Sequence, residues 1–144
     1  MNSLDTNILL YAANPDCKEH LCARQTLERL FADPDNLMIS HQILFEYYSG
    51  LRNPHIVSHP LSASQAAAKI QWLHEKTGSG FCSYEPKFWP QVLTLLSDDR
   101  FPFRRTFDAI LAATLLGNGV TTFYTRNDKD YRGFGFKKVI NPID

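Results

Sequence analysis

Short apolar segments that predict β-strands alternate with longer segments of helical spacing along the whole of this 144-residue chain. Each strand-like segment is only a few residues long and nearly all apolar, which is typical of strands buried on both faces. Strands that alternate with helices in this way form a parallel sheet covered by helices. The sequence therefore predicts an α/β fold with a short central parallel sheet and helices on both faces.

Helix caps and turn residues mark where these segments begin and end. Ser40 is a suitable N-cap for a helix that stops before Asn53-Pro54, and either Ser62 or Ser64 caps the next helix. The expected strands are a first one that ends at Leu4-Asp5, followed by residues 37–39, 81–84, 120–125 and 138–140. The expected helices are residues 8–13, 20–32, 41–51, a segment from the Ser62 or Ser64 cap to about 74, 86–97 and 108–116.

Length and composition favour one intracellular domain. A chain of 144 residues can bury a hydrophobic core without disulfides or a structural metal, so residues 1–144 are expected to form a single domain. The three cysteines are odd in number and lack the spacing of a zinc site, which predicts reduced thiols, and the five histidines show no pairing pattern. No segment has the roughly 18 apolar residues of a membrane span, and no basic flank precedes the N-terminal apolar stretch. We therefore expect a cytoplasmic protein without membrane contact.

Charge is unevenly distributed along the chain. The formal net charge is zero, which argues against a basic coat for nucleic acid over the whole surface. Residues 1–99 nevertheless carry 7 basic and 11 acidic side chains, whereas residues 100–144 carry 8 basic and 4 acidic ones. The C-terminal part can attract a polyanion locally, although an ordinary solvated surface has the same composition.

Five acidic residues carry the chemistry that the sequence suggests: Asp5, Glu46, Asp108, Asp128 and Asp130. Taken alone, Asp5 can accept hydrogen bonds from the following turn, Asp108 can cap its helix, and Glu46 can be a solvated surface acid. Asp128 and Asp130 follow an expected strand and can be polar loop residues. In a doubly wound sheet, however, strand ends and helix starts meet at one edge, so these acids are expected to share a pocket.

Carboxylates that converge on one pocket repel one another and need a cation. Hard oxygen ligands in this arrangement suit Mg²⁺ or Mn²⁺, which keep several waters and bind through a few carboxylates. Such an ion can activate a water for attack on phosphorus and neutralise charge on the phosphate oxygens. The acids thus indicate phosphodiester hydrolysis.

The order of short motifs along the chain resembles the PIN domain of VapC-type toxins. The motifs that carry the resemblance are Leu4-Asp5-Thr6-Asn7, Phe45-Glu46, Phe107-Asp108-Ala109-Ile110-Leu111-Ala112-Ala113, Thr125-Arg126-Asn127, Asp130-Tyr131 and Val139-Ile140-Asn141-Pro142. The resemblance covers essentially the whole chain. It implies a Mg²⁺-dependent (or Mn²⁺-dependent) endoribonuclease that forms a homodimer and acts as the toxin of a toxin-antitoxin pair, restrained by a VapB-like antitoxin.

The resemblance also assigns roles to the acids. Asp5 and Asp108 match the principal metal ligands of the family, and Glu46 matches its second acid. Asp130 matches the fourth acidic position, but Asp128, or a water held by Asn127, is an alternative.

Neighbouring polar and basic residues support this site in the same interpretation. Thr125 matches a family threonine that hydrogen-bonds a carboxylate or a water. Thr6 and Asn7 can orient Asp5, or can serve only in the turn and cap. Tyr131 replaces a more usual phenylalanine. Three arginines are candidates for holding RNA phosphates, with solvated loops as the alternative: Arg104, Arg105 and Arg126.

Two other functions compete with the ribonuclease. A phosphatase of the haloacid dehalogenase type also begins with an acid after its first strand, but it requires a second acid two residues later, where this chain has Asn7. A noncatalytic PIN-like module that binds RNA or a protein keeps the fold without turnover. The presence of all the candidate acids favours the enzyme. The sequence does not identify the RNA that is cleaved, the number of metal ions or the antitoxin.

Overall fold

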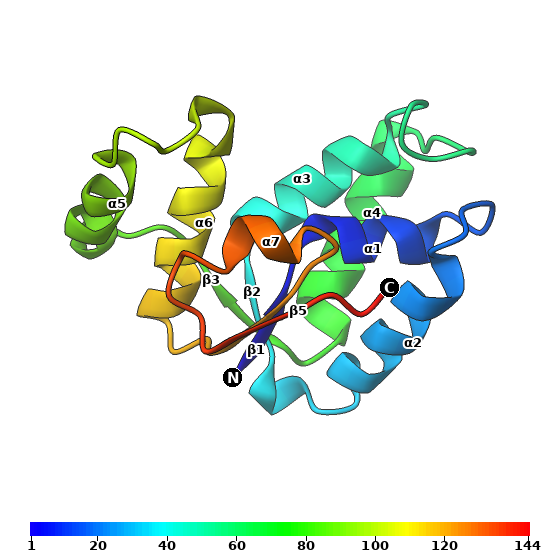
Figure 1. Cartoon of the computed structure of the whole chain (residues 1–144). Helices are drawn as coiled ribbons and strands as arrows, with labels where there is room; N and C mark the ends of the chain where they lie inside the picture. The colour runs from blue at the N-terminus through cyan, green and yellow to red at the C-terminus, as the bar shows by residue number, and fades with distance from the viewer.

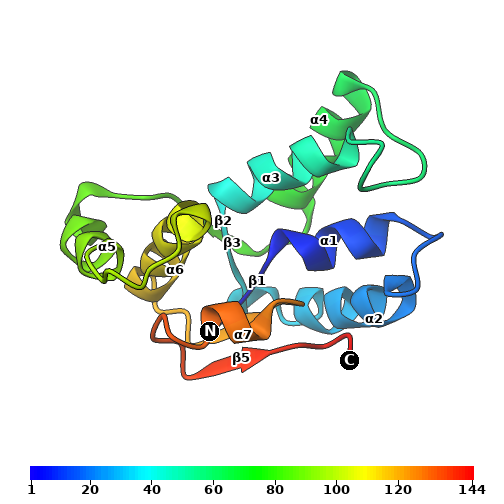
Figure 2. The ribbon, with the colours of Figure 1, turned by 45° about the horizontal axis from the view of Figure 1, so that its top comes forward.

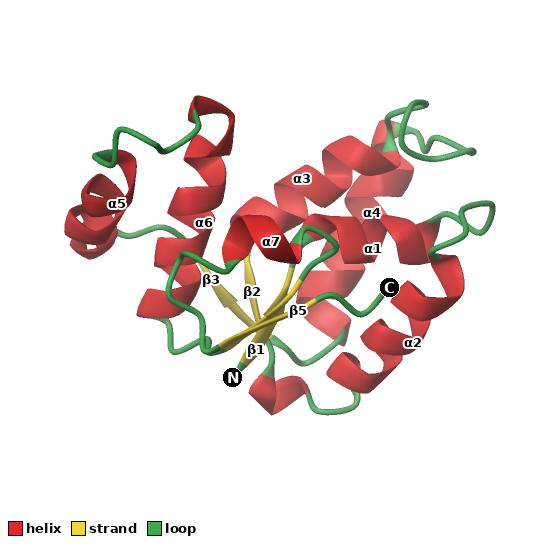
Figure 3. Ribbon diagram, viewed as in Figure 1, coloured by secondary structure: helices red, strands yellow, loops and turns green.

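A computed structural model describes all residues, 1–144, and contains five short parallel strands (Figures 1 and 3). β1, β4 and β5 form one sheet in the order β1-β4-β5, and β2 pairs with β3. A parallel bridge between Asn2 and Leu37 joins the two parts, which gives the overall order β3-β2-β1-β4-β5. The strands are β1 (Asn2–Leu4), β2 (Met38–Ser40), β3 (Gly80–Cys82), β4 (Thr122–Tyr124) and β5 (Lys138–Ile140).

Seven helices surround the strands. Figure 2 shows α5 and α6 together at one end of the molecule, and α3 and α4 side by side at the other, with α1 and α2 below them. The helices are α1 (Thr6–Ala13), α2 (His20–Phe31), α3 (His41–Leu51), α4 (Ala63–Lys76), α5 (Trp89–Leu96), α6 (Thr106–Gly117) and α7 (Asp128–Tyr131). The expected α/β architecture is confirmed.

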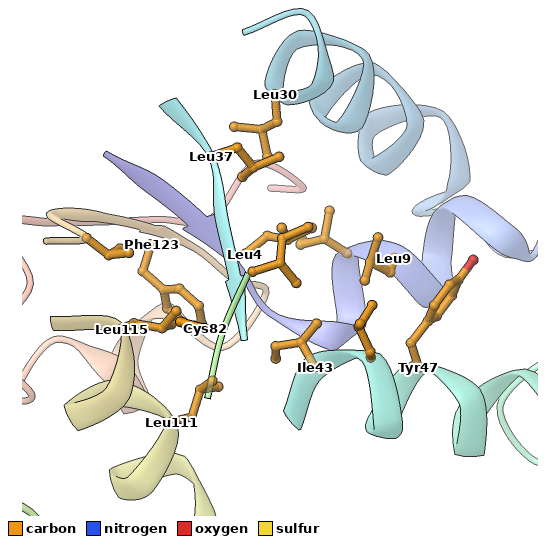
Figure 4. Packing of buried hydrophobic residues seen from close by; sticks show 14 of the residues in the cluster. Leu4, Leu9, Leu30, Leu37, Ile43, Tyr47, Cys82, Leu111, Leu115 and Phe123 are labelled. Carbon is orange, nitrogen blue, oxygen red and sulfur yellow. The ribbon is translucent and has the colours of Figure 1, made fainter. Parts of the chain in front are cut away.

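The strands lie between two groups of apolar side chains, which form most of a core cluster of 23 buried residues. Figure 4 shows Leu111 and Leu115 of α6 on one side of the strands and Leu9, Ile43 and Leu30 on the other. Because both faces are covered, the strands are apolar on successive positions, as the sequence predicted. This packing fixes the strand ends, from which the polar residues of the site project.

Element boundaries follow the predicted caps closely. The side chain of Ser40 accepts a hydrogen bond from the amide of Gln42 at the start of α3. Ser62, rather than Ser64, caps α4, and it forms a reciprocal capping box with Gln65. The third and fourth strands are shorter than predicted, and α5 is preceded by a separate 3-10 turn over Pro86–Phe88.

One short helix was not among the expected elements. Asp128 and Asp130, for which a polar loop was one interpretation, lie in the one-turn helix α7. Tyr131 ends this helix, is buried, and packs against the ring of Phe123 in β4. A helix of four residues is too short to show apolar periodicity in sequence, and its position depends on this tertiary contact.

None of the helices combines the length and the apolar character that crossing a membrane would require.

Candidate active site

Polar residues gather where β1, β2 and β4 end. Leu4 and Tyr124 are register partners in the parallel pair β1 and β4, so Asp5 and Thr125 follow neighbouring strands at the same level. In the strand order β3-β2-β1-β4-β5, the chain continues from β1 to β2 and β3 on one side, whereas β4 and β5 lie on the other side. The order of the strands therefore reverses between β1 and β4. Such a switch point is where open α/β sheets bind ligands, outside the carboxyl ends of the strands.

Asp5 is the most enclosed acid of this group. It caps α1, and its Oδ1 accepts a hydrogen bond of 2.8 Å from the amide of Thr6. Its Oδ2 accepts one of 2.7 Å from the hydroxyl of Thr125 and a longer one of 3.4 Å from Nδ2 of Asn7. Asp5 therefore serves as a helix cap and also stands at the centre of a polar network.

Burial controls the protonation of Asp5. Loss of hydration raises its pKa from 3.8 to about 6, even though the hydrogen bonds from Thr125 and Thr6 lower it. The negative charges of Glu46 and Asp108 raise it further. These two acids are thus close enough to Asp5 to influence its ionisation.

Glu46 reaches the network from the exposed side of α3. Its Oε2 accepts a hydrogen bond of 2.6 Å from the hydroxyl of Thr6, and its Oε1 accepts one of 3.0 Å from Nε2 of Gln42. The same amide nitrogen of Gln42 donates to the backbone carbonyl of Phe107 at 3.2 Å. Gln42 therefore links Glu46 to the first turn of α6, one residue before Asp108.

Asp108 does not cap α6, because its carboxylate is bound by two side chains instead. Oδ2 accepts a charged hydrogen bond of 2.5 Å from Nε of Arg105, and Oδ1 accepts one of 2.9 Å from the hydroxyl of Tyr131. Burial raises the pKa of Tyr131, and the charges of Asp5 and Asp108 raise it further, so the phenol stays a donor. The charges of both acids thus affect the pKa of Tyr131.

Arg105 connects two of the candidate acids and lies neither in a solvated loop nor at a site open to RNA. It is only 8% exposed, and its guanidinium lies over the rings of Tyr131 and Phe134 at 5.0 and 5.5 Å. Nη1 contacts Asp130 at 3.1 Å, while Nη2 is buried without a partner. Burial lowers its pKa, but the hydrogen bond and charge of Asp108 outweigh that effect and raise it. This position does not suit the expected role of Arg105 in holding RNA phosphates.

The two alternatives for the fourth acid have different surroundings. The carboxylate of Asp130 is 46% exposed and is joined to Asp108 through Arg105. Asp128 is 15% exposed and pairs with Arg132, the residue that follows α7. Asn127 is exposed, and its backbone amide donates to the hydroxyl of Thr125 at 3.0 Å. The network thus includes Asp130 and leaves Asp128 outside.

The acids are near one another but not in contact. No three His, Cys, Asp or Glu side chains are gathered closely enough to hold a metal ion between them. This differs from the tight cluster that the sequence suggested, because Thr6, Gln42, Arg105 and Tyr131 hold the carboxylates apart. The donor set still fits Mg²⁺, which binds through one or two carboxylates and keeps most of its waters. Burial raises the pKa of Asp5, the charges of Glu46 and Asp108 raise it further, and a bound cation would oppose both effects.

The remaining arginines differ in availability. Arg104 is exposed at the turn before α6. Arg126 follows Thr125, and its guanidinium is paired with Asp144. Its backbone amide also donates to Oδ1 of Asn7 at 3.3 Å.

Sequence reasoning missed the roles of Gln42 and Arg105. Both could have been found from helical spacing, since Gln42 precedes Glu46 by four residues and Arg105 precedes Asp108 by three. The sequence also assigned no role to the hydroxyl of Tyr131. Its contact with Asp108 depends on tertiary structure and has no local signal.

Comparisons with known proteins identify the family of this chain. The family model of the PIN domain matches residues 3–137. The ribonuclease VapC24 of Mycobacterium tuberculosis is 39% identical over 143 residues, which cover 99% of this chain and 97% of that protein.

Two solved structures show the same fold. The Mycobacterium tuberculosis toxin VapC20, which cleaves the sarcin-ricin loop, superposes with a TM-score of 0.68 at 20% identity, over 94% of this chain and 96% of that one. A toxin-antitoxin complex from Klebsiella pneumoniae superposes with a TM-score of 0.65 at 21% identity, over 99% and 98% of the two chains.

Proposed function

This chain belongs to the PIN domain family, and from that premise we propose that it is a metal-dependent endoribonuclease of the VapC type. The observation that carries the proposal is the buried Asp5 at the switch point of the sheet, with Glu46 and Asp108 near enough to raise its pKa. The 39% identity to a ribonuclease over nearly the whole chain supports the same activity.

Asp5 and Asp108 would hold a Mg²⁺ or Mn²⁺ ion, with Glu46 and Asp130 completing the acidic site directly or through water. When bound, such an ion supplies positive charge to the phosphate and lowers the pKa of a coordinated water. Thr125 and Asn7 hold Oδ2 of Asp5, and Thr6 joins Asp5 to Glu46. Arg105 and Tyr131 orient Asp108. These contacts limit the movement of each carboxylate before substrate arrives.

RNA would approach across the basic C-terminal part of the chain. Arg104 is exposed in the turn before α6, four residues before Asp108. The backbone amide of Arg126 donates to Asn7, which contacts Asp5. Because the guanidinium of Arg126 is paired with Asp144, we expect Arg104 to be more available than Arg126 for contact with an RNA phosphate.

We further propose that the protein is the toxin of a toxin-antitoxin pair, forms a homodimer and is restrained by a VapB-like antitoxin. Support comes from the solved toxin-antitoxin complex of the same fold. Phe45 on α3 is 66% exposed and Trp72 on α4 is 54% exposed, so both helices offer apolar surface for protein contacts. A basic side chain of the antitoxin would suit the acidic pocket.

Cleavage of RNA tests the catalytic proposal. Purified protein should cleave structured RNA with Mg²⁺ and not with EDTA, and Asp5→Asn and Asp108→Asn should each lose cleavage while remaining folded. Asp35→Asn, an exposed acid in the turn before β2, is the matched control and should retain full activity. Full metal-dependent cleavage by Asp5→Asn would refute the assignment. Tight RNA binding without cleavage under any condition would favour the noncatalytic module.

A further inference from the structure

His41 and His74 lie together on the surface, although they are 33 residues apart in the sequence. α3 leaves the carboxyl edge of the sheet and α4 returns beside it, as Figures 1 and 2 show. The first residue of α3 therefore meets the last turn of α4. The two Nε2 atoms are 3.3 Å apart. The spacing of the histidines in the sequence does not reveal this pair, because it depends on the helical hairpin.

Two residues at the end of β3 hold the imidazoles in place. Nδ1 of His41 is 2.6 Å from the hydroxyl oxygen of Ser83. The ring of Phe81 lies 4.3 Å from that of His74 and 5.9 Å from that of His41, measured between centroids. If Nδ1 of His41 donates to Ser83, its Nε2 carries a lone pair that accepts a hydrogen bond from Nε2 of His74. A metal ion would replace this hydrogen bond once His74 carries its proton on Nδ1 instead. A histidine that ligates a metal usually has its other nitrogen anchored in this way.

We propose that His41 and His74 form a binding site for a borderline transition-metal cation of the Zn²⁺, Ni²⁺ or Cu²⁺ class. Two nitrogens bound to a tetrahedral ion at about 2.0–2.1 Å lie about 3.3–3.4 Å apart. The observed separation of 3.3 Å matches that span without movement of either helix. Imidazole nitrogen prefers these metals to Mg²⁺, so the site differs in selectivity from the carboxylates around Asp5.

The surroundings leave room for the rest of the coordination shell. Both histidine contacts are exposed, and no third His, Cys, Asp or Glu joins them, so water fills the other positions. His41 and Ser83 line a shallow pocket of about 330 Å³ together with Glu85, whose negative charge favours a cation nearby. Bound metal would connect the start of α3, which carries Gln42 and Glu46, to the end of α4.

Metal binding without RNA tests this site independently of any nuclease activity. Equilibrium dialysis with Zn²⁺, in excess Mg²⁺ to occupy the carboxylates, should give one bound zinc per chain for the unmodified protein. His41→Ala and His74→Ala should each abolish that binding, and Ser83→Ala should weaken it about tenfold. Zn²⁺ should also raise the midpoint of thermal unfolding of the unmodified protein but not of the two histidine variants.

His59→Ala is the matched control, because His59 is an exposed histidine in another loop, 3.6 Å from Asp16. It should bind zinc like the unmodified protein. Circular dichroism should confirm that all variants are folded, as substitution of exposed side chains predicts. Retention of zinc by both His41→Ala and His74→Ala, or failure of the unmodified protein to bind any, would overturn the proposal. Loss of zinc with normal RNA cleavage would support this site and leave the proposed nuclease intact.

Discussion

The carboxyl group of Asp5 is buried at a position where ionisation is unfavourable, and its pKa is raised from 3.8 to about 6. Between these two values the folded protein binds more protons than the unfolded chain. The free energy of unfolding therefore decreases as pH rises from about 4 to about 6, and the deficit persists at neutral pH. A bound cation would offset the unfavourable ionisation of Asp5 and would therefore increase the free energy of unfolding.

We expect Asp5→Asn to stabilise the metal-free protein at pH 7 by about 1–3 kcal/mol, because it removes a buried charge of raised pKa. The gain should vanish below about pH 4, where Asp5 is protonated in both states. Urea denaturation with EDTA across this pH range measures the effect. Asp35→Asn should follow the unmodified protein at every pH, and a less stable Asp5→Asn at pH 7 would contradict the explanation.

Arg105 is expected to matter far more for stability than its neighbour Arg104. Arg105→Met leaves Asp108 and Asp130 without their shared cation, and loss of one partner of a buried ion pair costs about 3–5 kcal/mol. Because both carboxylates are partly exposed, we expect about 2–3 kcal/mol. Arg104→Met, which removes an exposed side chain that forms no hydrogen bond or ion pair, should change the free energy of unfolding by less than about 0.5 kcal/mol. Equal changes in the free energy of unfolding for the two substitutions, measured by urea denaturation, would contradict the stabilising role of Arg105.

Tyr131→Phe isolates the hydroxyl that donates to Asp108. The ring packing remains, so we expect a loss of about 1–2 kcal/mol from the charged hydrogen bond alone. If RNA is cleaved as proposed, the variant should need more Mg²⁺ for half-maximal rate, since Asp108 is less constrained. A Mg²⁺ titration measures this, and an unchanged requirement would show that Arg105 is sufficient to place Asp108.

At the scale of elements, caps and breakers determined most of what the sequence could predict. Ser40 begins α3 as expected, since its side chain needs only the adjacent helical amides. The choice between Ser62 and Ser64 remained open, because both precede a helical segment, and the structure selects Ser62 through its bond with Gln65. Interactions across elements, such as those of Arg105 with Asp130, require the tertiary fold.

The capping box of α4 gives a test at this scale. Ser62→Ala should lower the free energy of unfolding by about 1 kcal/mol, because the amide of Gln65 loses its acceptor. Ser64→Ala on the same helix is the matched control and should cost only a few tenths of that amount. Urea denaturation compares them, and a larger loss for Ser64→Ala would reverse the assignment of the cap.

At the scale of the whole molecule, the sequence predicted which edge of the sheet would carry the acids but not how they are held. Parallel topology alone brings Asp5 and Thr125 together, since β1 and β4 are neighbours. The separation of the carboxylates by Thr6, Gln42, Arg105 and Tyr131 follows from side-chain packing that no local pattern encodes.

The uneven distribution of charge makes a prediction for RNA binding. Asp5→Asn in EDTA should bind single-stranded RNA with an affinity that falls as salt rises. Adding Arg104→Ala should reduce the slope of log affinity against log salt by about 0.7, the value for one lost phosphate contact on a single strand. Arg24→Ala, an exposed arginine on α2, should leave the slope unchanged. An identical slope for all three proteins would exclude Arg104 from the RNA contact.

The hydrogen bond from Thr125 to Asp5 joins positions 120 residues apart, and β1 is enclosed only once β4 lies beside it. During synthesis, the first strand leaves the ribosome long before the fourth one exists. A nascent chain that ends at Asp108 therefore contains Asp5, Glu46 and Asp108 but lacks Thr125, which donates a hydrogen bond to Asp5. The site around Asp5 is therefore complete only after β4 and Thr125 have left the ribosome, so the proposed cleavage of RNA cannot begin before most of the chain has been synthesised.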